Sequence, residues 1–350
     1  MRKFIKSFAF SFLILSTAFL CTSCDINDIF LIDENYSIKS DEIVLRLANN
    51  HVEDFPTSKA CDYFAQLVEE RTDGKIKILC YHNSALGDEV STLKQVQLGG
   101  IDFARVSISL LAEYDPNLNL LSLPYLYENS SHMWSVLESE TGDSFLNSTQ
   151  LMKNGFEGLC WYTAGSRNFY SVKPLDNGIE SLKGLKIRTL ESQLVKDTVS
   201  ALGANSLPMK FEEVYPALVT GQVDAAENNI PSYISTQHYQ IAKYMILDEH
   251  LSIPEMIVVS KTTMDNLNHE QQEIIKECAK ESTRKQIELW NEYEKKCLET
   301  AVAEGCTIIT PTEEQKAEFK KAVQSVKDEY SKGYEDLIKR IENTPYNNDN

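Results

Sequence analysis

The sequence predicts an α/β protein in which two domains form a hinged clamshell that a long helix braces. The chain has 350 residues, which is more than one compact core usually holds, so two domains are expected. Strand-like segments alternate with amphipathic helical segments, as in parallel α/β packing. Residues 270–304 keep helical spacing without Pro or Gly, and such a helix would be about 52 Å long. Two shorter helices with a break remain the alternative for this stretch.

The first domain is expected to begin near residue 42, after a polar segment at 25–41 that we interpret as a tether. Alternation of apolar residues indicates strands, and apolar residues at helical spacing indicate amphipathic helices. The expected elements are strands at 43–47, 75–81 and 101–106 and helices at 58–71 and 93–98.

A second α/β unit follows, and the chain crosses between the units more than once. Strands at 159–163 and 168–171 are expected to carry the chain between the units. The expected elements that follow are strands at 184–188 and 223–227, helices at 194–202 and 214–220, an apolar run at 253–260 that returns to the first unit, and a last helical region at 313–341. Repeated crossing is the connectivity of a hinged clamshell. We therefore predict domain I at 42–164 plus 254–292, domain II at 165–253 plus 293–342, and a polar tail at 343–350.

The N-terminus predicts export. Arg2, Lys3 and Lys6 precede an apolar run at 8–20, which is too short to span a bilayer and is typical of a signal peptide. Small residues then precede Cys24, an arrangement that resembles a bacterial lipobox. We predict a signal peptide at 1–24 and an extracytoplasmic protein anchored to the cell membrane by a lipid on Cys24, in the periplasm if an outer membrane is present. An ordinary cleaved signal is the alternative.

The net charge and the cysteines limit which partners, ligands and disulfides are expected. The formal net charge is −18, and loss of the three basic residues of the leader makes the exported chain more acidic still. This excludes a nucleic-acid partner, which needs a basic face, but it does not exclude an anionic ligand held by a few buried arginines. No metal ion or cofactor is predicted. Buried free thiols are favoured over disulfides for the cysteines beyond Cys24, namely Cys61, Cys80, Cys160, Cys278, Cys297 and Cys306.

Candidate site residues are positive or amide side chains in small or apolar surroundings, and no catalytic motif is present. Arg188 ends a predicted strand, and Arg167 lies in a turn of small residues where the chain changes unit. A guanidinium matches a carboxylate through two hydrogen bonds, so two such residues favour an anion site over two structural salt bridges. Asn228 and Asn229 follow a strand and either contact a polar ligand or cap the next helix.

The order of several short segments resembles the DctP-type solute-binding proteins of tripartite ATP-independent periplasmic (TRAP) transporters, over about residues 44–341. The segments are SALGDE at 84–89, LSLPYL at 121–126, LKGLKIR at 182–188, EVYPAL at 213–218 and DAAEN at 224–228. The resemblance implies a periplasmic-binding-protein-like clamshell with hinge strands and a bracing helix. It also implies transport without chemical change of the ligand, with a small and a large membrane subunit as partners.

The resemblance also implies roles for individual residues. Arg188 pairs with the ligand carboxylate, and Arg167 is the second arginine of the site. The aromatic residue that packs on the ligand corresponds to Phe211. Polar contacts come from Asn50 or His51, Glu89, Glu191 and Asn228.

Two departures from the usual pattern bear on the ligand. The segment at 224–228 lacks the usual Gly-Gln pair, and the Pro that normally follows is displaced to Pro231. Glu191 stands where Asn is common, and its charge would repel a second ligand carboxylate while suiting sugar hydroxyls. The pattern resembles the branch that binds hexuronates such as glucuronate or galacturonate. The alternatives are a C4-dicarboxylate or other carboxylate binder, a sensory ligand-binding protein, and an acid-sugar lyase.

Overall fold

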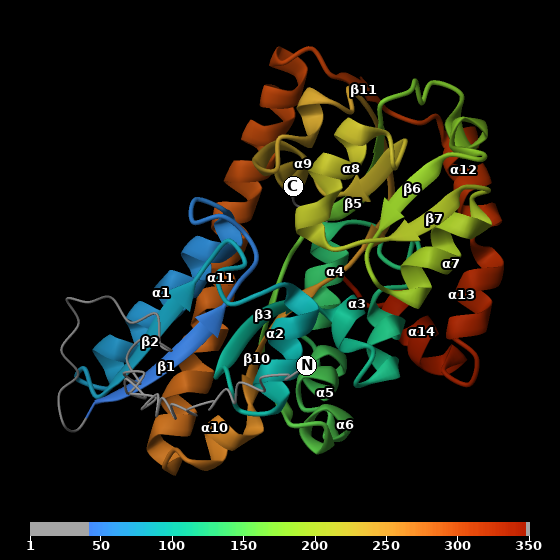
Figure 1. Cartoon of the computed structure of the whole chain (residues 1–350). Helices are drawn as coiled ribbons and strands as arrows, with labels where there is room; N and C mark the ends of the chain where they lie inside the picture. The colour runs from blue at the N-terminus through green and yellow to red at the C-terminus, as the bar shows by residue number, and fades with distance from the viewer. Residues whose placement is uncertain (1–41, 348–350) are drawn as a thin grey trace, which may run out of the picture. The chain divides into compact units, whose positions relative to one another are not determined.

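The computed structural model describes residues 42–347 (Figure 1). The predicted signal peptide, Cys24, and the tether up to residue 41 lie outside the described residues. None of the described helices combines the length and apolar character that a membrane span requires.

The first sheet has five strands in the order β2-β1-β3-β10-β4. They are β1 (Ile43–Ala48), β2 (Ile76–Tyr81), β3 (Phe103–Ser107), β4 (Phe156–Tyr162) and β10 (Glu255–Ser260). β1 runs parallel to β2 and β3, whereas β10 is antiparallel to β3 and β4. The predicted strands of the first unit and the returning apolar run are confirmed. The helices α1 (Pro56–Arg71) and α2 (Glu89–Gln97) are present too, and α2 begins four residues before the predicted start.

The second sheet has six strands in the order β11-β9-β5-β8-β6-β7. They are β5 (Ser166–Ser171), β6 (Lys186–Thr189), β7 (Asn205–Pro208), β8 (Ala225–Asn228), β9 (Tyr244–Ser252) and β11 (Thr307–Ile309). β6 is parallel to β7 and β8, whereas β5 is antiparallel to β8 and β9. Strands β7, β9 and β11 were not predicted.

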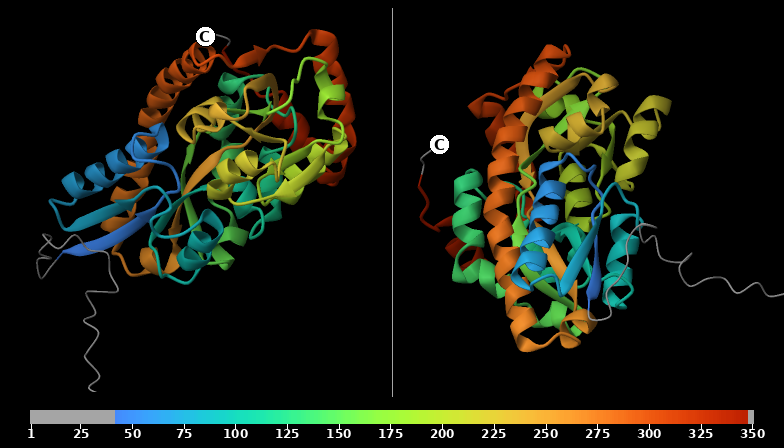
Figure 2. Two further views of the ribbon diagram at one scale, coloured as in Figure 1. Left: turned by 45° about the horizontal axis from the view of Figure 1, so that its top comes forward. Right: turned by 90° about the vertical axis from the view of Figure 1, so that its left-hand side faces the viewer.

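The long helix is one unbroken element, α11 (His269–Ala303) of 35 residues. Asn268 and Gln271 form a capping box at its start, which satisfies free backbone donors of the first turn. On the side of the first sheet it packs on α1 and β4, and on the side of the second sheet it packs on α9 (Ile230–Ser235) and β11 (Figure 2). The bracing role is confirmed, and the two-helix alternative is wrong.

The remaining helices cover the sheets and connect them. They are α3 (Ile108–Leu111), α4 (Ser130–Leu137), α5 (Glu140–Leu146), α6 (Thr149–Lys153), α7 (Gln193–Ala201), α8 (Val214–Thr220), α10 (Lys261–Asp265), α12 (Glu313–Ala322), α13 (Gln324–Tyr330) and α14 (Glu335–Glu342). The described residues also form four 3-10 helices, namely η2 (Pro116–Leu121), η3 (Gly178–Leu182), η4 (Phe211–Glu213) and η5 (His238–Gln240). The predicted last helical region is therefore three helices, and Gly333, with φ of +85°, separates α13 from α14.

Two short crossings connect the sheets, from β4 to β5 and from β9 to β10, so the fold is a two-domain clamshell with hinge strands. The exact domain limits stay a prediction. The C-terminal helix α14 packs against α4, where the Nε2 atom of His132 lies 2.8 Å from the Ile341 carbonyl oxygen. All six cysteines of the described residues are free thiols and five are buried, as predicted.

Candidate functional site

The strand directions bring the candidate residues to the ends of the strands, where the two sheets face each other. Asn50 and His51 follow the carboxyl end of β1, and Glu89 begins α2. In the second sheet Arg188 lies in β6 and Asn228 ends the parallel strand β8. Ligands of open α/β sheets bind in the crevice outside the carboxyl ends of the strands, so this arrangement positions a binding site.

A small cavity of about 20 Å³ lies between these edges. Five of the eight predicted ligand contacts line it: Asn50, Glu89, Arg188, Glu191 and Phe211. His51 meets its rim through Phe211, because the two ring centroids lie 5.6 Å apart, edge to face. Arg167 and Asn228 are not part of the lining. The volume is that of about one water molecule, so a larger ligand requires the two edges to separate.

Arg188 carries a buried positive charge without a bound carboxylate. Its side chain is only 1% exposed, and its Nε and Nη2 atoms both donate to the Met209 carbonyl oxygen, at 3.0 and 2.6 Å. Within residues 42–347 no carboxylate lies within ion-pair distance of it. Burial lowers the pKa of Arg188, since the charged form loses hydration. A buried cation of this kind favours an anionic ligand.

Arg167 differs from Arg188, because a carboxylate of the chain itself forms an ion pair with it. Its Nε atom donates to the Glu227 carboxylate, its Nη2 atom donates to the Glu227 carbonyl oxygen at 2.8 Å, and its Nη1 atom donates to the Asn228 side-chain oxygen at 3.1 Å. The Asn228 oxygen also accepts from the Asn229 backbone at 2.9 Å. Asn229, for its part, caps α9 through Ser232, as the capping alternative for the Asn pair predicted.

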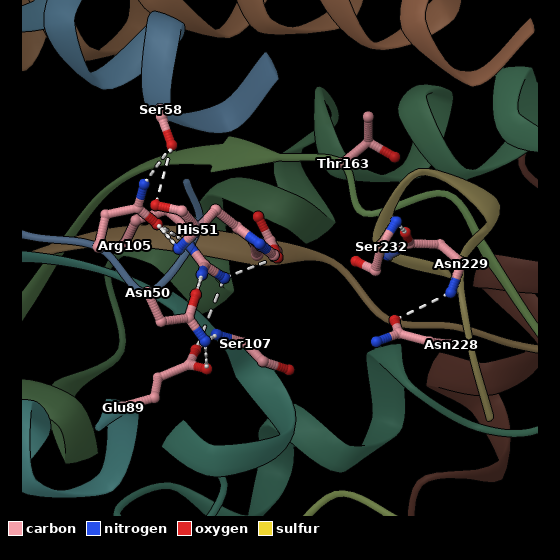
Figure 3. A network of polar contacts seen from close by, with 12 residues as sticks. Asn50, His51, Ser58, Glu89, Arg105, Ser107, Thr163, Asn228, Asn229 and Ser232 are labelled. Carbon is pink, nitrogen blue, oxygen red and sulfur yellow. Dashed lines mark hydrogen bonds and ion pairs between the residues drawn. The ribbon is translucent and has the colours of Figure 1, made fainter. Parts of the chain in front are cut away.

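Sequence reasoning missed Arg105, which organises the first-domain side of the site (Figure 3). This buried residue of β3 donates to the Asn49 side chain at 3.1 Å, to Glu255 at 2.7 Å and to the Asn50 side-chain oxygen. The bond from Arg105 orients the Asn50 amide, and the amide nitrogen donates to Glu89 at 3.1 Å. An arginine inside the apolar segment 101–106 was the signal that could have revealed it.

Glu89 and His51 are the other first-domain residues predicted to contact the ligand, and burial shifts the pKa of both. Glu89 accepts from the Ser107 backbone at 2.5 Å, and burial raises the pKa of Glu89 despite the nearby guanidinium. His51 stacks on Phe55 with ring centroids 4.0 Å apart. Burial and the charge of Arg105 lower the pKa of His51 to about 4, so its imidazole is neutral at physiological pH.

Charges around the cavity suit one anionic group and several hydroxyls. The acidic residues of the lining are Asp88, Glu89, Glu191 and Glu212, and the basic ones are Arg188 and Lys210. Lys210 is paired with Asp88, so Arg188 is left as the cation for a ligand. Carboxylates accept hydrogen bonds from hydroxyls but repel a further anion. The described residues contain no group of three or more His, Cys, Asp or Glu side chains that could hold a metal ion.

Behind Arg167 lies a buried charge cluster that couples stability to pH. The Nδ1 atom of His250 is 2.9 Å from Asp248, its Nε2 atom is 3.8 Å from Glu227, and its ring stacks on Phe169. Burial alone would lower the pKa of His250, but the two carboxylates raise it to about 9. Burial would raise the pKa of Glu227, but Arg167 and His250 lower it to about 2.

We expect the free energy of unfolding to fall as pH rises through about 9, because folded His250 holds a proton that unfolded His loses near pH 6.5. The contribution, on the order of 3 kcal/mol, is complete below pH 6.5 and lost above pH 9. Denaturant unfolding from pH 6 to pH 10 measures it, and His250→Gln should flatten the curve. The control is His269→Gln, which changes an exposed histidine. Parallel curves for wild type and His250→Gln would contradict the expectation.

Two α/β domains whose facing edges enclose an unpaired buried guanidinium define a two-domain binding protein for anionic solutes. The chain belongs to the DctP family, described as bacterial extracellular solute-binding protein, family 7, whose profile matches residues 47–333. This family includes the solute-binding proteins of TRAP transporters, so the family resemblance and the clamshell prediction are confirmed.

Similar proteins agree with this assignment. A solute-binding protein of Chromohalobacter salexigens is 31% identical, with 83% of this chain and 85% of that protein covered. A TRAP periplasmic solute-binding protein of Xanthobacter autotrophicus, solved with bound β-D-galacturonate, is 35% identical with a TM-score of 0.82, covering 86% of this chain and all of that one. One from Pseudomonas putida, solved with bound D-glucuronate, is 32% identical with a TM-score of 0.84, covering 87% and 99%.

Proposed function

We propose that this protein captures a hexuronate outside the cytoplasmic membrane and delivers it unchanged to a TRAP transporter. The observation that carries the proposal is Arg188, a buried guanidinium whose hydrogen bonds go to one backbone carbonyl while no carboxylate of the described chain lies within ion-pair distance of it. Arg105 and Arg167, by contrast, each bond a buried glutamate. A ligand carboxylate supplies the missing negative charge at Arg188.

In the proposed mechanism the domains part, the ligand enters, and closure buries it. Arg188 holds the carboxylate, and Arg167, which has N–H groups beyond those already donated, adds a second contact together with Asn228. Asn50, Glu89 and Glu191 bind ring hydroxyls, while His51 and Phe211 cover the ring. Exclusion of water strengthens each charge-assisted hydrogen bond.

The ligand class follows from the charges of the cavity and from the similar proteins. Glu191, Glu212, Asp88 and Glu89 line the cavity, so a second carboxylate on the ligand would meet negative charge on several sides. Sugar hydroxyls, in contrast, can donate to these oxygens. Galacturonate and glucuronate are the ligands in the two related structures described above. A hexuronate therefore fits better than a C4-dicarboxylate.

Calorimetric titration of residues 25–350 with glucuronate, galacturonate, succinate and sialic acid tests the ligand class. We expect saturable binding of at least one uronate and binding of succinate at least tenfold weaker, because each like-charge contact in a partly buried site costs about a factor of ten or more. A stronger response to succinate would overturn the assignment to hexuronates while leaving carboxylate capture in place. Recovery of chemically intact uronate after prolonged incubation separates capture from an acid-sugar lyase.

We further propose that a lipid on Cys24 tethers the domain to the membrane, where it meets the small and large membrane subunits. The leader sequence and the cysteine after small residues support this proposal. Metabolic labelling with a palmitate analogue should mark the wild-type chain and leave Cys24→Ala unlabelled. Ligand uptake that requires the membrane subunits distinguishes transport from sensing.

A further inference from the structure

Two polar contacts connect the two domains at the rim of the cavity. The ammonium group of Lys210, just before η4, donates to the Asp88 carboxylate at 2.9 Å. Ser84 donates through its hydroxyl group to the carboxylate of Glu212 in η4. The partners are 122 and 128 positions apart in sequence, and each contact joins the loop before α2 to the segment that precedes α8.

The loop that carries Ser84 and Asp88 is a fixed platform. The backbone N–H of Asn83 donates to the His51 carbonyl oxygen at 2.7 Å, so the loop is attached to the segment that carries first-domain site residues. Asn83 and Ser84 have φ angles of 53° and 57°, a left-handed conformation that non-glycine residues keep only where the surroundings hold them. Asp88 in turn caps α2 by accepting from the Ser91 backbone at 3.0 Å.

The segment on the opposite side is attached to the anion site. The Met209 carbonyl oxygen accepts both hydrogen bonds of Arg188. The next residue, Lys210, pairs with Asp88, and the ring of Phe211 packs nearly perpendicular to the ring of His51. The cross-domain contacts therefore lie only one to three residues after Met209, the residue whose carbonyl oxygen Arg188 binds, on a single stretch of backbone.

We propose that Lys210 and Glu212 form a latch with loop 84–88 that holds the closed form, and that their segment couples carboxylate capture at Arg188 to closure. The coupling rests on the proposed function, whereas the latch acts in the ligand-free protein as well. The side chains of Lys210 and Asp88 are 45% and 19% exposed, so solvent screens the pair. Loss of a partly exposed pair of this kind changes an equilibrium about two- to fivefold.

Variants at both cross-domain contacts test the latch. Asp88→Asn removes the charge but keeps an oxygen that caps α2 at Ser91, and Lys210→Met removes the other charge. Ser84→Ala tests the second contact at a residue that does not line the cavity. Glu213→Gln is the control, because Glu213 is the neighbour of Glu212 and has no hydrogen bond or ion pair to the described residues of the first domain.

Two quantities are measured on the exported chain. The first is the dissociation rate of glucuronate, measured by stopped-flow competition. The second is the fraction of ligand-free protein in the closed form, measured as the distance between two labels on non-natural residues, one in each domain. Asp88→Asn, Lys210→Met and Ser84→Ala should each raise the dissociation rate two- to fivefold and lower the closed fraction, whereas Glu213→Gln should change neither. The double variant Asp88→Asn/Lys210→Met should match either single variant, since both remove one interaction.

The proposal would be overturned if the three latch variants had the same dissociation rate and closed fraction as the wild type. Fully additive effects of Asp88→Asn and Lys210→Met would overturn it as well. If wild-type protein binds no sugar acid, the proposed function fails on its own. The closed fraction of the ligand-free variants then still decides whether the latch exists.

Discussion

Replacing Arg188 with methionine is expected to weaken hexuronate binding by roughly 30-fold to several thousandfold. The variant leaves the ligand carboxylate buried opposite an apolar side chain, and such a loss costs about 2–5 kcal/mol. Methionine keeps most of the side-chain volume, so the strand β6 and its neighbours retain their packing. Calorimetric titration of wild type and variant with glucuronate and galacturonate measures the change.

The matched control is Arg71→Met, which removes an arginine whose partner is Glu281 on α11, outside the cavity. It should bind like wild type. Thermal unfolding adds a second criterion: Arg188→Met should unfold at or above the wild-type temperature without ligand, because an uncompensated buried cation is removed, and should gain no stability from uronate. Wild-type affinity in Arg188→Met would refute the role of this residue.

Replacing Arg167 with methionine is expected to destabilise the folded protein by about 3–5 kcal/mol, the typical cost of breaking a buried ion pair. Glu227 is completely buried, and Arg167 donates to both its carboxylate and its carbonyl oxygen. Without the guanidinium the nearest cationic group to the Glu227 carboxylate among the described residues is His250, at 3.8 Å. Denaturant unfolding at pH 7 measures the change in the free energy of unfolding.

The double variant Arg167→Met/Glu227→Gln is the control, because it removes both charges together. It should regain a large part of the lost stability, since the penalty arises from one uncompensated carboxylate rather than from lost volume. Equal destabilisation of the single and the double variant would show that packing, and not charge, dominates at this position.

Much of the fold could be predicted because apolar periodicity reports burial. The strands around 43–47 and 253–260, the helix at 58–71 and the long helix all have apolar residues at regular intervals, and all are present. Strand β9 was missed for a physical reason. Its Asp248 and His250 are buried as an ion pair, so polar residues stand where a pattern based on burial expects apolar ones.

For the site, the sequence by itself determined the end-of-strand position of Arg188 and the segments that approach it, because a short motif specifies local backbone. Only the tertiary structure decided which buried arginine pairs with which carboxylate. Arg167 meets Glu227 at 60 positions' distance in sequence, and Arg105 meets Glu255 at 150. Strand pairing and hinge crossings create these contacts, and no local pattern encodes a partner so far away. The arginine left without a carboxylate is therefore a property of the folded chain.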